Sequence, residues 1–487
     1  MNLTPRFVAV ALAASLAFVG PPAAAQFRPP PLQPLTMTSA PGQRAYQAER
    51  VGVFNGQQVT YRAELTETLV KDKDGNTLTN VFAFSYLAEA QKNAKRPVVF
   101  IYNGGPGGAS VFLNFGALGP KIFEPDLDAK ATAPSTQLVD NPLAPLDVAD
   151  LVFLDPPDTG YGRTLPGVDT KPLYSIDGDS EAMSQAVVNW LRAHDRMDAP
   201  VYLYGESYGS MRAVAMARDL VRSPHKVEVA GIMFGGNSFG YFQKGQMPDI
   251  LYSANALPMM ASVAWRHGKI DNKHQTWDQA VDKARRYAHT DYISALMLGN
   301  RATPATRRAV MKTLPGIIGI DETYFRNKDT IVIEGDFFTE LLKDRNLIVD
   351  SDDGRKTRPA ATKGPANSPF ARYGSAMEAY VRDTFRANDL GPYVPVNTKL
   401  NSAWNYYVSG AMALDVTLAE IMRDRPSLRV LMTQGRFDTL TTLGNSEYIM
   451  AQTHLPLNRY SEAYYDGGHS LLPQPEVMAA IRTFLKP

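Results

Sequence analysis

VYLYGESYG, residues 201–209, is the stretch that decides which fold this chain is expected to adopt. Its first four residues, Val201 to Tyr204, form a short apolar run that is typical of a strand buried in a parallel sheet. The pattern of Met211 to Arg222 then predicts a helix. Glycines two residues before and after Ser207 permit the sharp, strained turn that lifts a serine hydroxyl clear of a sheet. An ordinary glycine turn is the alternative, but the strand before it and the helix after it favour Ser207 as a nucleophile.

Similar short apolar runs recur along the chain, at Val98 to Tyr102, Leu151 to Leu154, Gly231 to Phe234 and Leu428 to Thr433. Between two of them, apolar residues at helical spacing give a face that can pack on a sheet: Met183, Ala186, Val187, Trp190 and Leu191. This alternation predicts an α/β fold, in which a mostly parallel central sheet carries helices on both faces. Earlier, alternating segments at Gln58 to Thr66 and Asn80 to Leu87 predict a β-hairpin with its turn at Asp72 to Asn76.

The rhythm of strands divides the chain into parts. Residues 46–247 and 406–487 are expected to form the first and second parts of one core. Between them, residues 248–405 read as helical and polar, which predicts a helical insertion that acts as a lid, with a loop from Asp350 to Ser368. Residues 26–45 are expected to be a proline-rich linker.

The first 25 residues have the features of a signal peptide. Arg6 precedes the apolar run Phe7 to Val19, and small residues end the segment at Ala25. This run is far shorter than the ~20 residues that span a bilayer, so no stable membrane insertion is expected. We expect cleavage near Ala25 and a periplasmic or secreted protein.

Composition limits the possible partners. With 50 basic and 49 acidic residues, the net charge of +1 favours neither nucleic acid nor an anionic surface. The absence of cysteine excludes disulfides and thiolate catalysis. The histidines have no metal-ligand spacing, so neither a metal nor another cofactor is expected.

A serine nucleophile needs a base and a carboxylate that orients the base. His469 is preferred as the base, because it lies on a glycine-rich loop between a strand and the final helix, Glu476 to Leu485. Asp438 is preferred as the carboxylate, because its loop follows the strand before His469. Asp466 is the alternative, but it lies too near His469 in sequence to bond the far nitrogen of the ring.

The glycine-rich segment NGGPGGAS, residues 103–110, follows the strand that ends at Tyr102. Glycines let backbone N–H groups approach a developing oxyanion, and the segment lacks the lysine of a phosphate-binding loop. Four further segments accompany it in order: ALGP (117–120), VFLDP (152–156), GESYG (205–209) and GGH (467–469). Together they resemble the signature of the serine carboxypeptidases, from about Asn80 to Leu485, with the insertion unmatched.

This resemblance implies an α/β-hydrolase fold and a role for each matching residue. Ser207, Asp438 and His469 would form the catalytic triad, and the N–H groups of Gly105 and Tyr208 the oxyanion hole. The carboxylate of a peptide with a free C-terminus would be held by Asn103, Gly104 and Glu206. One departure is Ala117, which stands where the family usually has a glutamate paired with the one before the nucleophile. Glu206 would then have to be protonated, or a cation such as Arg212 or Arg436 would have to compensate.

The sequence therefore predicts an exported serine-type carboxypeptidase that acts through an acyl-enzyme on Ser207. A serine esterase or an acyltransferase of the same fold is the alternative, since the fold and the triad do not name the acyl group. A non-enzymatic binding protein that uses the same cleft is a third possibility.

Overall fold

The computed structural model describes residues 44–89, 95–127, 135–239, 250–362, 369–406 and 414–486. The expected signal peptide and most of the expected linker lie outside these residues. No helix in the described ranges is long and apolar enough to cross a membrane.

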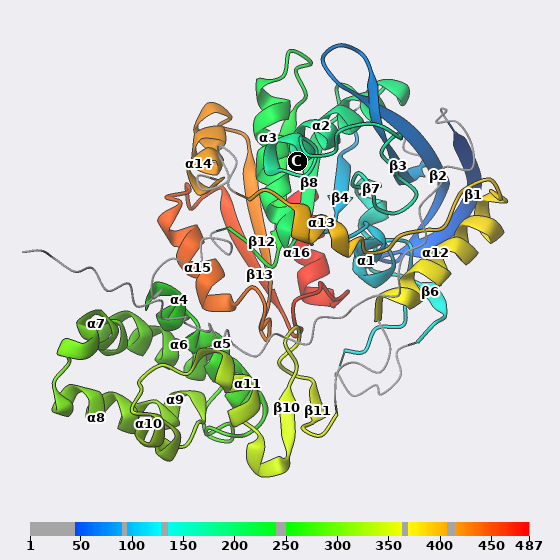
Figure 1. The fold of residues 1–487 in the computed structure, drawn as a ribbon. Coiled ribbons are helices and arrows are strands. Elements are labelled where there is room, and N and C mark those ends of the chain that lie inside the picture. Colours follow the sequence, from blue (N-terminus) through cyan, green and yellow to red (C-terminus); the bar gives the residue numbers. More distant parts are fainter. Residues whose placement is uncertain are drawn as a thin grey trace, which may run out of the picture.

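A nine-stranded sheet forms the centre of the molecule, in the order β1-β2-β3-β7-β4-β8-β9-β12-β13 (Figure 1). Strands β1 to β3 and β7 pair antiparallel, and β7 to β13 pair parallel. The parallel strands predicted from the apolar runs are thereby confirmed, as is the hairpin of β2 and β3. The strands are β1 (Ala45–Phe54), β2 (Gln57–Lys71), β3 (Thr77–Ala88), β4 (Val98–Tyr102), β7 (Asp150–Asp155), β8 (Val201–Glu206), β9 (Val229–Gly235), β12 (Arg429–Gly435) and β13 (Tyr460–Tyr465).

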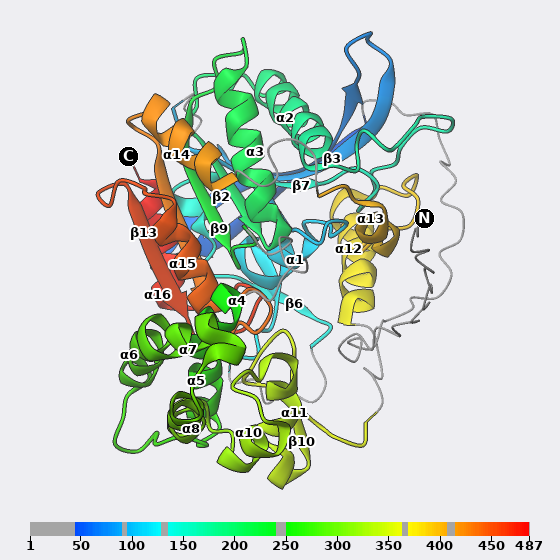
Figure 2. The same ribbon diagram turned by 60° about the vertical axis from the view of Figure 1, so that its left-hand side comes forward.

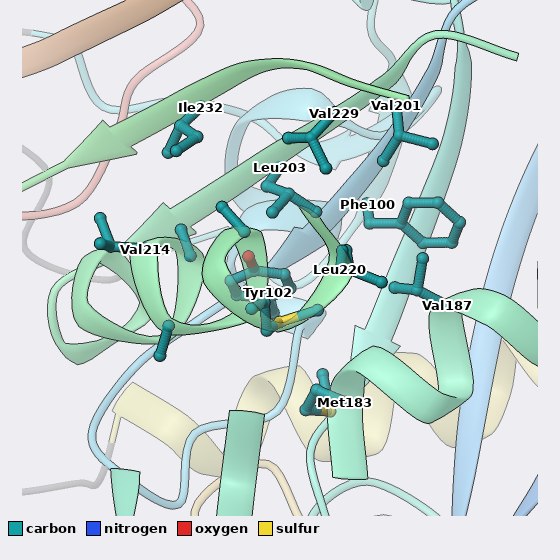
Figure 3. Close-up of a cluster of buried hydrophobic side chains, with 14 of the residues drawn as sticks. Phe100, Tyr102, Met183, Val187, Val201, Leu203, Val214, Leu220, Val229 and Ile232 are labelled. Atoms are coloured by element: carbon teal, nitrogen blue, oxygen red, sulfur yellow. The ribbon is translucent and has the colours of Figure 1, made fainter. Parts of the chain in front are cut away.

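Helices cover both faces of this sheet, because its central strands are apolar on both sides. In β4, Val98, Phe100 and Tyr102 belong to one core, and Val99 and Ile101 to another. Figure 3 shows the first core, where side chains of β4 and β8 meet those of α2 and α3. The helices of this face are α2 (Ile176–Ala193), α3 (Tyr208–Arg222) and α14 (Leu414–Asp424); those of the other include α16 (Pro475–Leu485) and α12 (Pro369–Phe385).

Between β9 and β12 the described chain is mostly helical. Helices α4 to α11 pack around a hydrophobic core of their own, and they form the lower part of the molecule in Figure 2. They are α4 (Ile250–Asn255), α5 (Leu257–Arg266), α6 (Trp277–Tyr287), α7 (Ile293–Leu298), α8 (Pro304–Thr313), α9 (Pro315–Ile318), α10 (Glu322–Lys328) and α11 (Phe337–Glu340). Helix α13 (Thr398–Ala403) precedes α14, and α15 (Leu443–Gln452) follows β12.

The prediction of a loop from Asp350 to Ser368 is wrong in part. The chain forms a hairpin there, from β10 (Leu347–Val349) and β11 (Thr357–Pro359). Strands of three residues are too short to show an alternating pattern, so they could not be predicted from the sequence. Another small pair, β5 (Lys121–Phe123) and β6 (Leu138–Asp140), was missed for the same reason.

Candidate active site

Ser207 lies on a sharp turn between β8 and α3, as its motif predicts. Its backbone has φ 60° and ψ −129°, a strained conformation for a residue with a side chain. The turn is tight enough that a Cβ on Gly205 would lie 1.9 Å from the carbonyl oxygen of Gly209. The Ser207 N–H donates to the Gly235 carbonyl at the end of β9, 2.8 Å away. Glycine at position 205 is therefore a steric requirement of this turn.

Asp438 and His469 come together because their loops follow neighbouring parallel strands, β12 and β13. The Nδ1 atom of His469 lies 3.1 Å from Oδ2 of Asp438, whose side chain is fully buried. Oδ1 of Asp438 also accepts hydrogen bonds from the N–H groups of Leu440 and Thr441, both at 2.9 Å. This fixes the carboxylate before it meets the ring. Asp466, the alternative, is not the carboxylate that contacts His469.

The charged form of His469 is stabilised by its surroundings. Burial lowers the pKa of His469, but the carboxylate of Asp438 outweighs this effect, and the pKa rises to about 9. The charges of Glu206 and Asp352 add to the increase. An imidazolium formed by accepting a proton would therefore be well accommodated.

Gly236 places the imidazole of His469 next to the Ser207 turn. It has φ +56°, and a Cβ on it would lie 2.8 Å from Cε1 of His469. The preceding residue, Gly235, accepts the hydrogen bond from the Ser207 N–H. The serine backbone thus bonds to Gly235 and the ring packs against Gly236, two successive glycines at the end of β9. The structure brings the predicted nucleophile and the predicted base together at one edge of the sheet.

The loop after β4 packs directly on this turn. A Cβ on Gly104 would lie 2.5 Å from the Tyr208 nitrogen, so only glycine allows the two backbones to approach. Gly105 follows with φ +114°, and Tyr208 lies in the first turn of α3, where N–H groups have no acceptor within the helix. Gly105 and Tyr208, the predicted oxyanion donors, are thereby neighbours. Arg212 supports this loop by donating to the Asn103 carbonyl at 2.6 Å.

Glu206 is buried beside the turn, with 4% of its surface exposed. One carboxylate oxygen accepts from Nδ2 of Asn103 at 3.0 Å, and the other accepts from the N–H of Leu471 at 2.8 Å. Burial raises the pKa of Glu206 above its ordinary value, although the charge of His469 and these hydrogen bonds oppose the increase. Glu206 thus connects the Asn103 loop with the loop of His469, and it gains a proton more readily than an exposed glutamate.

Neither arginine considered as a compensating cation is placed to serve Glu206. Arg212 is fully buried, and its Nε atom lies 2.7 Å from Oδ2 of Asp179. The guanidinium of Arg436 stacks over the ring of Trp277, 4.9 Å from its centre. Asp179 and the ring of Trp277 therefore engage these two positive charges.

Tyr373 on α12 is a site residue that the sequence did not indicate. Its hydroxyl would lie 3.6 Å from a Cβ on Gly116, the neighbour of the fully buried Ala117. The rings of Phe112 and Phe123 hold the tyrosine, with centres 4.7 and 4.9 Å away. Burial raises the pKa of Tyr373, and the charge of Glu206 raises it further against the opposing effect of Arg372. The charge of Glu206 thus acts on Tyr373, which lies on a helix that carries none of the recognised motifs.

An open cavity of about 1110 Å³ lies elsewhere, between β2 and α2. It reaches Asp219 and Ser223 near the end of α3. Because α3 has 15 residues and is about 22 Å long, this cavity lies at the opposite end of the helix from Ser207. Within the described parts of the chain, no group of three or more His, Asp or Glu side chains is arranged to hold a metal.

Among curated proteins, "Serine carboxypeptidase-like 34" of Arabidopsis thaliana is 30% identical over 208 residues, which are 39% of this chain and 38% of that protein. The chain thus matches less than half the length of this relative.

Solved structures with a similar chain path include a peroxisomal alpha-beta-hydrolase from Saccharomyces cerevisiae and a proline iminopeptidase from Mycobacterium smegmatis. The first has 12% identity and a TM-score of 0.35 and covers 91% of this chain and 88% of its own. The second has 13% identity and a TM-score of 0.36 and covers 86% and 97%.

The mostly parallel sheet with helices on both faces, and the strand–turn–helix at Ser207, are the features expected of the α/β-hydrolase fold. The family model described as "Serine carboxypeptidase" matches residues 74–480, which is most of the chain. On this match, and with the site placed as described, the chain belongs to the serine carboxypeptidase family.

Proposed function

We propose that this chain is an exported serine-type carboxypeptidase, which hydrolyses the last bond of peptides with a free C-terminus. Family membership supports the class of enzyme. The observation that carries the proposal is the position of Glu206 and Asn103, hydrogen-bonded to each other and buried beside the Ser207 turn. Groups that hold the terminal carboxylate there would place only the final peptide bond over Ser207.

In the proposed reaction, His469 takes the proton of the Ser207 hydroxyl as its oxygen attacks the carbonyl carbon of the last peptide bond. The N–H groups of Gly105 and Tyr208 stabilise the negative charge that develops on the carbonyl oxygen. His469 then gives its proton to the leaving nitrogen, the C–N bond breaks, and the C-terminal amino acid departs. Water attacks the ester on Ser207, with His469 again as the base, and releases the shortened peptide. Asp438 orients the imidazole throughout.

Glu206 binds the substrate in its protonated form. An ionised Glu206 would repel the terminal carboxylate, whereas a protonated one can donate a hydrogen bond to it. The raised pKa of Glu206, caused by burial, supports this form. The charge of Arg212 is already engaged by its ion pair with Asp179.

An esterase or acyltransferase of the same fold is the second candidate. It is favoured by Ala117, which gives Glu206 no acidic partner and weakens the expected carboxylate site. A carboxypeptidase requires the free terminal carboxylate of its substrate, whereas an esterase or acyltransferase does not.

A pair of substrates tests this function. A blocked dipeptide with a free C-terminus should be hydrolysed at least about 100-fold faster than the same dipeptide as its amide, because only the acid is anchored. Ser207→Ala should abolish this activity, and Ser375→Ala, at an exposed position on α12, should retain it. Comparable rates on acid and amide, or turnover of esters alone, would favour the second candidate instead.

Export is tested separately, by determining the first residue of the mature protein after expression of the full chain. A start near Gln26 in the fraction outside the cytoplasm is expected. An uncleaved Met1 in the cytoplasm would contradict this part of the proposal.

A further inference from the structure

The β10–β11 hairpin, Leu347 to Pro359, follows helices α4 to α11 in the chain. It contacts both loops that carry the proposed catalytic pair (Figure 1). Its Gly354 N–H donates to the Phe437 carbonyl at 2.9 Å, next to Asp438. Its Asp352 carbonyl accepts from the backbone N–H of His469 at 2.8 Å. One short hairpin therefore bonds to the main chain of two separate loops.

The fit between the hairpin and the two loops is close. Asp353 forms an antiparallel bridge with Asp438. On the other side, a Cβ on Gly468 would lie 2.5 Å from the Cα and Cβ atoms of Asp353. The backbone of Asp353 thus lies between the residue that carries the carboxylate and the loop that carries the imidazole.

The side chain of Arg355 stabilises this contact. The residue is buried, with 7% of its surface exposed. Its Nε and Nη2 atoms donate to the two carboxylate oxygens of Asp353, at 2.9 and 2.7 Å. Its Nη1 atom donates to the carbonyl of Asp466, at 2.5 Å, and to that of Leu127, at 2.6 Å. Burial lowers the pKa of Arg355, but the hydrogen bonds and charge of Asp353 outweigh it, and the pKa is raised. A charged fork therefore joins the hairpin to the His469 loop.

The hairpin fixes the two loops of Asp438 and His469, which the strands of the sheet alone do not hold. Strand β12 ends at Gly435 and β13 ends at Tyr465, so Asp438 and His469 both lie on loops beyond the strands. Loops of this kind hold a side chain precisely enough for catalysis only when other groups fix them, and a misplacement of 1 Å can cost about 100-fold in rate.

We propose that Arg355 is a positioning residue, which aligns the His469–Asp438 pair by fixing the β10–β11 hairpin against both catalytic loops. The inference rests on the proposed function, since it takes Ser207, His469 and Asp438 as the reacting groups. Arg355 does not touch the substrate. Through the hairpin, it connects helices α4 to α11 with the two loops that carry Asp438 and His469.

The test compares Arg355→Met with Arg358→Met in the full chain. Arg358 lies on the same hairpin, but it is exposed and donates to the Thr362 carbonyl within the segment. We expect Arg355→Met to lower kcat about 100-fold, with KM changed less than about threefold. The rate of Ser207 labelling by a fluorophosphonate should fall by a similar factor. Arg358→Met should keep wild-type values, and Arg355→Lys should recover part of the loss by retaining the charge.

A spectroscopic measurement separates positioning from folding. The Nδ1 proton of His469, which faces Asp438, should give a far-downfield proton resonance in wild type and in Arg358→Met. It should shift or broaden in Arg355→Met while the melting temperature remains above that of the assay. Among the described residues, the charges of Asp438, Glu206 and Asp352 act on His469, and none of them is altered in these variants. If Arg355→Met does not fold, Arg355→Lys and Asp353→Asn carry the same test.

Two failures can be told apart. Wild-type protein that is not labelled at Ser207 would overturn the proposed function, and the role of Arg355 with it. Wild-type protein that is labelled, together with an Arg355→Met variant that matches Arg358→Met in kcat and in the downfield resonance, would overturn the role of Arg355 alone. So would a loss of kcat that follows the unfolded fraction alone.

Discussion

Nδ1 of His469 lies 3.1 Å from Oδ2 of Asp438, and the carboxylate of Asp438 is fully buried. The carboxylate engages Nδ1, so Nε2 is the nitrogen available to accept a proton. It also makes Asp438 the main cause of the raised pKa of His469, about 9, because burial alone would lower that pKa. The pair therefore sets both the orientation and the basicity of the ring.

Asp438→Asn should lower kcat by about 10⁴-fold, because an amide favours the wrong tautomer of the imidazole. The sign of the pH effect follows from the cause of the shift. Wild-type kcat/KM should rise with pH as His469 loses its proton near pH 9, and in Asp438→Asn this rise should move to lower pH. The profile is measured with an ester that has no carboxylate. Asp466→Asn is the control, and a larger effect there than at Asp438 would exchange the two assignments.

Glu206→Gln should remove a pH dependence of substrate binding. In wild type, KM for a peptide with a free C-terminus should rise as pH increases through the raised pKa of Glu206, because the ionised carboxylate repels the substrate. Glutamine stays neutral, so its KM should be flat over the same range. Since one oxygen of Glu206 accepts from Asn103, the variant's melting temperature is measured alongside. Parallel KM profiles for the two proteins would remove Glu206 from substrate binding.

Tyr373→Phe should weaken binding of the terminal carboxylate. Loss of one hydrogen bond corresponds to an increase in KM of about 3- to 10-fold for the acid substrate, with kcat little changed. The matching amide should show no such increase. Tyr380→Phe provides the control, since Tyr380 lies on the same helix and packs against Phe115 and Phe385 instead. An equal change for acid and amide would indicate a packing role for Tyr373.

Gly104→Ala should disable the site by sterics. The added Cβ would lie 2.5 Å from the Tyr208 nitrogen and 2.6 Å from the Glu206 carbonyl oxygen. The loop must move away from α3, so the N–H groups of Gly105 and Tyr208 separate, and kcat should fall about 100-fold or more. Gly391→Ala is the control, because no atom lies within 4 Å of a Cβ there. Active-site labelling of both variants checks the result, and normal labelling of Gly104→Ala would contradict it.

Asp155→Asn should change the pH dependence of stability. Burial raises the pKa of Asp155 to about 6 against the lowering effect of Ser110, and its Oδ2 atom has no hydrogen-bond partner among the described residues. The pKa of Asp155 in the folded protein lies above the unfolded value of about 3.9. Its contribution to stability is therefore fully present below about pH 4 and is lost as the pH rises through about 6.

Relative to wild type, Asp155→Asn should therefore gain on the order of 2–3 kcal/mol of unfolding free energy between about pH 4 and pH 8. Urea denaturation at several pH values measures this difference. The exposed Asp74→Asn serves as the control and should follow the wild-type curve. An Asp155→Asn curve parallel to that of wild type would show that Asp155 does not titrate as inferred.

The pattern of apolar runs was sufficient to predict the parallel strands of the sheet, and the GESYG segment its sharp turn at Ser207. Both are local: a strand buried on two faces must be apolar throughout, and the turn requires glycine beside the serine. The choice of Asp438 over Asp466 for contact with His469 could also be made from the sequence, because a carboxylate on the neighbouring strand's loop reaches the ring and one on the same loop does not.

What only the tertiary structure decided lies between segments distant in sequence. Tyr373 meets the surroundings of Glu206 because α12 folds back on the core, and Arg355 meets the loops of Asp438 and His469 through a hairpin of two three-residue strands. Neither contact has a local signal, since a tyrosine or an arginine in a polar helical region resembles any exposed side chain. By itself the sequence predicted the nucleophile and the order of its partners, and it determined the class of fold, because these depend on backbone shape and alternating burial. The surroundings that adjust the site depend on long-range packing, which only the folded chain brings together.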